Sequence, residues 1–105
     1  MEKFCDLIKG DKPVFVIFYA TWCPHCRKML PIVSQLGKHK ELIFLKYDID
    51  DPANKRLVDY YQIQAVPLMM IYRAGEQLWR KTGEMEEEEL MQIVKRLLES
   101  RRTVI

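Results

Sequence analysis

Two cysteines three residues apart, Cys23 and Cys26, are the side chains of this sequence best suited to chemistry. An apolar, β-rich segment, residues 14–20, precedes them, and a helical pattern follows them. On the first turn of a helix, positions i and i+3 face the same side, so the two sulfurs can form a disulfide and part again. A Cys-x-x-Cys in this setting is typical of a redox centre rather than of a structural disulfide.

The position of Cys23 favours ionisation of its thiol. Pro24 suits the first helical position, where a backbone N–H is not needed. Cys23 then lies where unpaired N–H groups and the positive end of the helix dipole stabilise a thiolate. His25 adds positive charge beside that thiolate when it is protonated. We therefore predict that Cys23 is the nucleophile at the surface, and that Cys26 is a shielded thiol that attacks the mixed disulfide formed by Cys23.

The hydrophobic pattern predicts the elements that must position this pair. Their expected order is helix, strand, helix, strand, helix, strand, strand, helix. The expected ranges are 1–9, 14–20, 24–39, 42–48, a short helix after Pro52, 68–72, 77–81, and a last helix from about Glu86. Strand–helix–strand units require parallel pairing with right-handed crossovers, whereas the last two strands form an antiparallel hairpin. The pattern thus predicts an α/β fold, a mixed sheet of about four strands flanked by helices.

Length and charge limit the classes of function. The 105 residues suit one domain, 1–105, with a modest core. A net charge of +2 with scattered lysines and arginines does not indicate nucleic-acid binding. No apolar run approaches the roughly 18 residues of a membrane span. The N-terminus lacks the layout of a signal peptide, which favours a cytoplasmic protein unless a leader has been removed.

Several further motifs resemble those of the thioredoxin family, and the resemblance covers nearly all of the chain. They are residues 18–29, Pro31, 47–50, 61–67, Gly75-Glu76 and Gly83. The resemblance implies a thioredoxin fold that lacks the family's first strand, because the sequence starts at the first helix. It also implies a thiol–disulfide oxidoreductase that exchanges disulfides with protein substrates. Such a protein binds no cofactor and depends on a partner reductase or oxidase to reset it.

The resemblance also implies roles for residues outside the cysteine pair. The Val66-Pro67 bond is expected to be cis, with the backbone of Val66 pairing with an extended substrate segment. Trp22 is expected to flank the site as an apolar platform. Lys46 occupies the position of the family's lysine beside its buried Asp, and it is expected to help tune the active site. The expected rim positions are Ile49, Ala65, Thr82 and Gly83.

Three departures from the family pattern carry predictions. Pro24 and His25 replace the usual Gly-Pro between the cysteines, as in DsbA-type disulfide oxidases, and a better stabilised thiolate makes the couple more oxidising. Ile17 stands where the family keeps a buried Asp that is thought to take the proton of the second cysteine. The missing first strand leaves strand 42–48 as an exposed edge. We expect a monomer, with a dimer through that edge as the alternative.

Two other classes of function remain open. A thioredoxin-like adaptor could hold peptides without redox turnover, although binding alone does not require both cysteines. A metal or iron–sulfur site is the third hypothesis, yet zinc prefers four ligands and the chain has one Cys-x-x-Cys. Cys5 is expected to be a small buried hydrophobe, with a regulatory thiol or an intermolecular disulfide as the alternative. Of Met69 and Met70, one is expected in the core and one in the active-site groove.

Overall fold

The computed structural model describes residues 2–100, and its elements follow the predicted order. They are α1 (Glu2–Ile8), β1 (Val14–Tyr19), α2 (Pro24–Ser34), the 3₁₀-helix η1 (Gln35–Lys38), β2 (Ile43–Asp48), the 3₁₀-helix η2 (Pro52–Asn54), α3 (Lys55–Tyr60), β3 (Leu68–Arg73), β4 (Glu76–Thr82) and α4 (Glu87–Ser100). None of the helices in this described part is long and apolar enough to cross a membrane.

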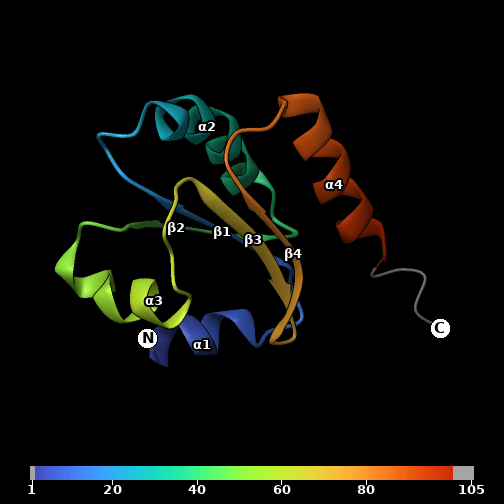
Figure 1. The fold of residues 1–105 in the computed structure, drawn as a ribbon. Helices are drawn as coiled ribbons and strands as arrows, with labels where there is room; N and C mark the ends of the chain where they lie inside the picture. The colour runs from blue at the N-terminus through green and yellow to red at the C-terminus, as the bar shows by residue number, and fades with distance from the viewer. Residues whose placement is uncertain (1, 101–105) are drawn as a thin grey trace.

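The four strands form one mixed sheet in the order β2-β1-β3-β4 (Figure 1). β1 pairs with β2 in parallel, and it pairs with β3 antiparallel. β3 and β4 form the antiparallel hairpin, with an irregularity in register between Ile71 and Tyr72. The predicted mixed sheet of four strands is confirmed.

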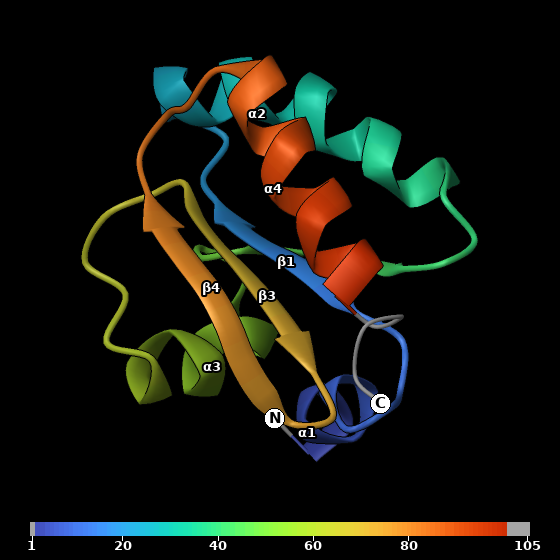
Figure 2. The same cartoon turned by 90° about the vertical axis from the view of Figure 1, so that its right-hand side faces the viewer.

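Helices cover both faces of the sheet. α2 and α4 lie on one face, and α1 and α3 lie on the other (Figures 1 and 2). Alternation along β1 supplies both cores. Phe15 and Ile17 belong to the cluster that also holds residues of α2 and α4. Val14, Val16 and Phe18 belong to the cluster with α1 and α3. β1 is therefore buried on both faces, which explains its unbroken apolar sequence.

The helix expected over 24–39 is shorter than predicted. α2 ends at Ser34, and the chain continues as η1. Gly37 lies in this tighter turn, and a Cβ built on it would lie 3.6 Å from the Phe44 ring. Glycine is a weak helix former and permits close approach of the backbone. The end of the predicted helix therefore becomes a 3₁₀ turn against β2.

Met69 and Met70 do not divide between core and groove. Both are fully buried, with Met69 in the cluster under α2 and α4 and Met70 in the cluster with α1 and α3. The prediction that one of them lines the groove is wrong, because β3 is an interior strand with a helical layer on each side.

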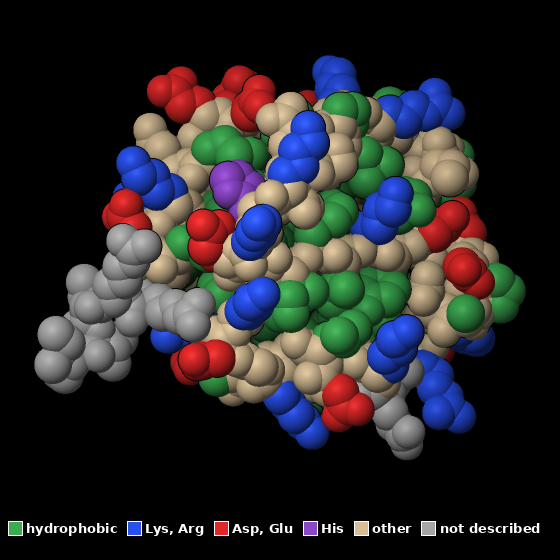
Figure 3. Space-filling model, turned by 180° about the vertical axis from the view of Figure 1, so that it is seen from behind, with side chains coloured by type: hydrophobic (Ala, Val, Ile, Leu, Met, Phe, Trp, Pro, Cys, Tyr) green, Lys and Arg blue, Asp and Glu red, His purple; other side chains and the backbone are tan. Residues whose placement is uncertain are grey.

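β2 lies at one edge of the sheet, as predicted for strand 42–48. Lys46 is the exposed residue near its middle. The side of the molecule that carries this edge shows hydrophobic side chains bordered by lysines and arginines (Figure 3). A lysine on an edge strand discourages pairing with another strand.

Candidate active site

The site is built where β1 gives way to α2. Cys23 is the N-cap residue of α2 and Pro24 occupies the first helical position. The amide of Cys23 donates to the carbonyl of Ala20 across 3.2 Å, and its carbonyl accepts from the amide of Arg27 across 3.1 Å. These backbone bonds fix the turn and the start of the helix. The Cys23 thiol is therefore held at the positive end of the helix dipole.

Both cysteines of the pair are free thiols, and both are buried, which was expected for Cys26 alone. Cys26 is fully buried and Cys23 is 4% exposed. The expected order of exposure is correct, but the expectation of an open surface thiol at Cys23 is wrong. The physical reason is the neighbouring backbone, since Sγ of Cys23 donates to the carbonyl oxygen of Val66 across 3.6 Å.

The pKa of Cys23 is lowered below its ordinary value. Burial acts in the opposite direction and is the largest single influence on this pKa. It is outweighed by hydrogen bonds from the Cys26 thiol and from the backbone amides of Cys26 and His25, together with the positive charge of Arg27. Arg27 is held in place by a bond of 3.1 Å from its Nε to the carbonyl of Thr21. The start of α2 thus stabilises a thiolate despite its enclosure.

The pKa of Cys26 is shifted in the opposite direction. Burial, followed by its hydrogen bond and charge interaction with Cys23, raises the pKa of Cys26 to about 11, although a backbone hydrogen bond at Ala20 acts against this. The two thiols therefore separate into one that ionises readily and one that keeps its proton. That separation is the electrostatic basis for assigning a nucleophile and a resolving thiol.

The loop before β3 faces the pair. The Val66-Pro67 bond is cis, as the family resemblance implies. Pro67 is buried, Val66 is half-buried and Ala65 is exposed. Val66 packs on the small cluster formed by Ala20, Cys23 and Cys26. The expected neighbourhood of proline loop and cysteine pair is therefore present.

Gly83 joins the turn after β4 to this loop. Its amide donates to the carbonyl of Pro67 across 2.8 Å, and its φ of +97° lies in the left-handed region that favours glycine. Thr82, the last residue of β4, is exposed. The predicted rim position at Gly83 thus lies against the proline loop.

Trp22 is 61% exposed and is nevertheless anchored. Its indole Nε1 donates to the carboxylate Oδ2 of Asp50 across 2.7 Å. Asp50 follows β2, where its own amide donates to Oδ1 of Asp48 across 2.9 Å. A hydrogen bond to a charged acceptor is strong for an exposed group. The indole is therefore a fixed apolar surface beside Cys23.

His25 contributes differently from its sequence-based role. Its ring Nδ1 contacts the carboxylate of Glu84, in the turn between β4 and α4, and only its backbone amide acts on the pKa of Cys23. Lys28 lies near the same carboxylate, with 3.9 Å between Nζ and Oε1. The hydrogen bond from His25 lowers the pKa of Glu84, slight burial opposes this, and the charges of Lys28 and His25 add to the lowering.

Lys46 lies opposite Ile17, the position that the family resemblance implies. Its Cα pairs with that of Ile17, and its side chain is exposed at the sheet edge. The influences that shift the pKa of Cys26 come from burial, Ala20 and Cys23, and do not include Lys46. Ile49 does approach the site, since it packs on the cluster of Ala20, Cys23 and Cys26.

The remaining candidates are less involved. Cys5 is half-buried in α1. Among residues whose placement the structure describes, no group of three or more His, Cys, Asp or Glu side chains could hold a metal ion. His39 is exposed and lies 3.8 Å from the carboxylate of Glu41.

A model of the thioredoxin family, described as "Thioredoxin", matches residues 1–96. The chain belongs to the thioredoxin family. A thioredoxin-like protein of Synechocystis sp. is 34% identical over 91 residues, which cover 86% of this chain and 87% of the relative. A thioredoxin of Rickettsia bellii is 36% identical over 80 residues, or 74% of each chain.

The solved structures agree on the fold. A crystal structure of Malassezia sympodialis thioredoxin superposes with a TM-score of 0.77 at 22% identity, covering 90% of this chain and 85% of that one. The thioredoxin fold, with its four-stranded mixed sheet flanked by helices, is therefore established for this chain. The family relationship supports thiol–disulfide oxidoreductase chemistry in general terms, and the cysteine pair that this chemistry needs is present.

Sequence reasoning missed three contributors to this thioredoxin-family site. Arg27 and Asp50 lie inside motifs that were recognised, but their roles depend on contacts that the motifs do not state. Glu84 was not considered, and it lies 59 residues from the histidine that it contacts. The position of Glu84 directly after Gly83 was the available signal.

Proposed function

We propose that this chain exchanges disulfides with protein substrates, with Cys23 as the nucleophile and Cys26 as the resolving thiol. The observation that carries the proposal is the opposite direction of the two pKa shifts at neighbouring thiols. An adaptor that only held peptides would not require one thiol poised to ionise and the other held protonated beneath it.

The exchange has two balanced steps. In the first, the Cys23 thiolate attacks one sulfur of a substrate disulfide, forms a mixed disulfide and releases the other substrate sulfur as a thiolate, which takes a proton from water. In the second, Cys26 gives its proton to solvent and attacks Sγ of Cys23, and the remaining substrate sulfur leaves. Two electrons pass from the cysteine pair to the substrate. Oxidation of a substrate dithiol is the same sequence in reverse.

The proline loop supports the choice of an extended substrate segment. Val66 presents a backbone carbonyl 3.6 Å from the reactive sulfur. A peptide that pairs with the Val66 backbone would bring its own sulfur to that point by strand addition. Ala65, Gly83 and the anchored indole of Trp22 would line the approach. Pro67 is buried, and its carbonyl accepts from the amide of Gly83, which holds the loop in place.

The redox direction is the finer part of the proposal. We infer a DsbA-type tendency toward oxidation from Pro24 and His25, because a stabilised thiolate stabilises the reduced form of the pair. The double variant Pro24→Gly, His25→Pro should then be less oxidising than the parent chain in a glutathione redox buffer. An unchanged or more oxidising equilibrium in the variant contradicts this role for the dipeptide.

Turnover requires a partner. The cysteine pair leaves each cycle in the opposite redox state, so a reductase or an oxidase must reset it, and no bound cofactor is proposed. Catalytic reduction of insulin by dithiothreitol tests the activity. We expect Cys23→Ser to abolish the acceleration and Cys5→Ser, which preserves the pair, to retain it. Equal activity of the Cys23→Ser variant and the parent would contradict the proposal, and peptide binding that survives without turnover would favour the adaptor.

A further inference from the structure

Glu84 ties the turn between β4 and α4 to the start of α2. Its carboxylate accepts a hydrogen bond from Nδ1 of His25 and lies 3.9 Å from Nζ of Lys28. The Glu84 side chain is 34% exposed, against 64% for His25 and 73% for Lys28. Glu84 is therefore the more enclosed partner in both contacts.

These contacts complete a chain of interactions that begins at Cys23 and ends at the first turn of α2. The Cys23 thiol reaches the carbonyl of Val66 in the proline loop. The next residue of that loop, Pro67, accepts from the amide of Gly83, and Glu84 follows Gly83 in the chain. Glu84 then contacts His25, which lies in the first turn of α2. Three segments that are distant in sequence are thus held in one arrangement.

The same carboxylate lies among positively charged side chains at the start of α2. The first turns of α2 carry His25, Arg27 and Lys28, and positive charge near a thiolate stabilises it. Glu84 places a negative charge against His25 and Lys28, and its contact with Nδ1 holds the His25 ring at the β4–α4 turn. A less stabilised thiolate means a less stabilised reduced pair, and hence a couple that is less oxidising.

We propose that Glu84 is a positioning residue that holds the His25 ring toward the β4–α4 turn and keeps the Cys23–Cys26 couple less oxidising than its Pro24-His25 dipeptide would otherwise be. This inference rests on the proposed function, because it concerns the equilibrium of that same cysteine pair. It assigns a role to a residue outside the cysteine and proline motifs.

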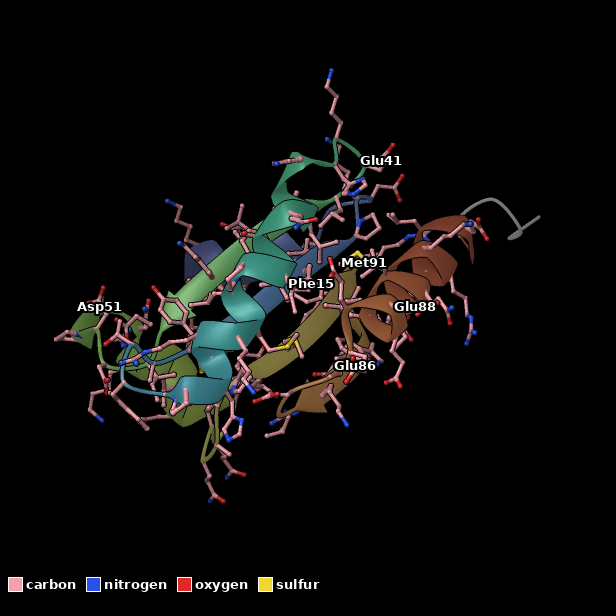
Figure 4. All side chains as sticks on the ribbon, turned by 90° about the horizontal axis from the view of Figure 1, so that it is seen from above. Phe15, Glu41, Asp51, Glu86, Glu88 and Met91 are labelled. Atoms are coloured by element: carbon pink, nitrogen blue, oxygen red, sulfur yellow. The ribbon has the colours of Figure 1, made fainter. Side chains whose placement is uncertain are left out.

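The test measures the equilibrium of the full chain with glutathione. The reduced pair and one molecule of oxidised glutathione give the Cys23–Cys26 disulfide and two molecules of reduced glutathione. We expect Glu84→Gln to shift this equilibrium toward the reduced protein about threefold, in the range that exposed ion pairs reach. Glu86→Gln is the matched control, since it removes the same charge from the same turn. Figure 4 labels Glu86, which lies in this turn directly before α4.

A His25→Asn background tests whether Glu84 acts through His25. In that background, Glu84→Gln should change the logarithm of the equilibrium constant by less than about half of the change that it causes in the parent chain. Glu84→Asp, which keeps the carboxylate, should stay closer to the parent chain than Glu84→Gln does. Equal equilibria for the parent, Glu84→Gln and Glu86→Gln overturn the inference, as does a full Glu84→Gln effect without His25. A parent chain that stays reduced at every glutathione ratio overturns the proposed function itself.

Discussion

The thiol of Cys23 donates to the carbonyl oxygen of Val66 across 3.6 Å. The nucleophile and the proposed substrate-pairing backbone are therefore in direct contact. Cys23 is only 4% exposed, and the Val66 carbonyl is one of the groups that enclose it. We therefore expect selectivity for an extended, disulfide-bearing segment that can pair with this loop.

Gly83 should be required for activity as well as for stability. Alanine at a φ of +97° costs about 1–2 kcal/mol of unfolding free energy. Gly75→Ala is the matched control, because Gly75 also has a positive φ, of +80°, but lies in the β3–β4 turn. We expect both variants to lose similar stability in urea unfolding, and only Gly83→Ala to lose kcat/KM for insulin, by about tenfold. Equal kinetics in the two variants would contradict a rim role for Gly83.

Release of the mixed disulfide should be strongly pH-dependent. The pKa of Cys26 is raised to about 11 in the free pair, chiefly by burial. The contribution of Cys23 disappears in the mixed disulfide, but burial remains. Since only the thiolate attacks, the rate should rise about tenfold per pH unit from pH 7 to 9. Stopped-flow release of thionitrobenzoate from Cys23 measures this rate.

The control for that measurement is Cys26→Ala, which should retain the mixed disulfide at every pH. A release rate in the parent chain that is flat between pH 7 and 9 would mean that Cys26 ionises readily. The assignment of Cys26 as a protonated, buried resolving thiol would then be wrong.

The hydrogen bond between Trp22 and Asp50 should lower KM for protein substrates. Asp50→Ala removes the acceptor that lies 2.7 Å from the indole nitrogen and frees the ring. We expect KM for insulin to rise about threefold, an estimate that corresponds to an exposed hydrogen bond to a charged group, while reduction of a small aromatic disulfide is unchanged.

Tyr60→Ala provides the comparison for Asp50→Ala. Tyr60 is about as exposed as Trp22, at 64%, but it lies on α3. Within residues 2–100, its ring contact is with Tyr61, and no hydrogen bond joins it to Asp50. Its loss should leave both activities unchanged. If Asp50→Ala and Tyr60→Ala behave alike, the fixed indole has no special part in binding substrates.

Periodicity was sufficient to predict the elements and the sheet. The continuous apolar run of β1 indicates a strand with helices on both sides, and the parallel pairing with β2 follows from the intervening helix. The cis bond before Pro67 came from the family resemblance, because no local pattern states it. A cytoplasmic location and a monomeric state stay predictions.

The charges around the cysteines could not be predicted in the same way. Glu84 is followed by four more glutamates, Glu86 to Glu89, and no spacing indicates which carboxylate meets His25. The enclosure of Cys23 depends on the position of the Val66 carbonyl, which the tertiary arrangement decides. The resemblance placed Lys46 beside Ile17, and the register agrees, but the exposure of the Lys46 side chain follows from the position of β2 at the sheet edge.

The alkylation rate of Cys23 as a function of pH tests the central claim most directly. In a Cys5→Ser chain, iodoacetamide should react first with Cys23, because the pKa of Cys26 is raised to about 11 and its thiol is fully buried. We predict a midpoint below the value of about 8.5 for a free cysteine, and a rate at pH 7 above that of a free cysteine. A midpoint at or above that value, with no excess rate at pH 7, would contradict the account.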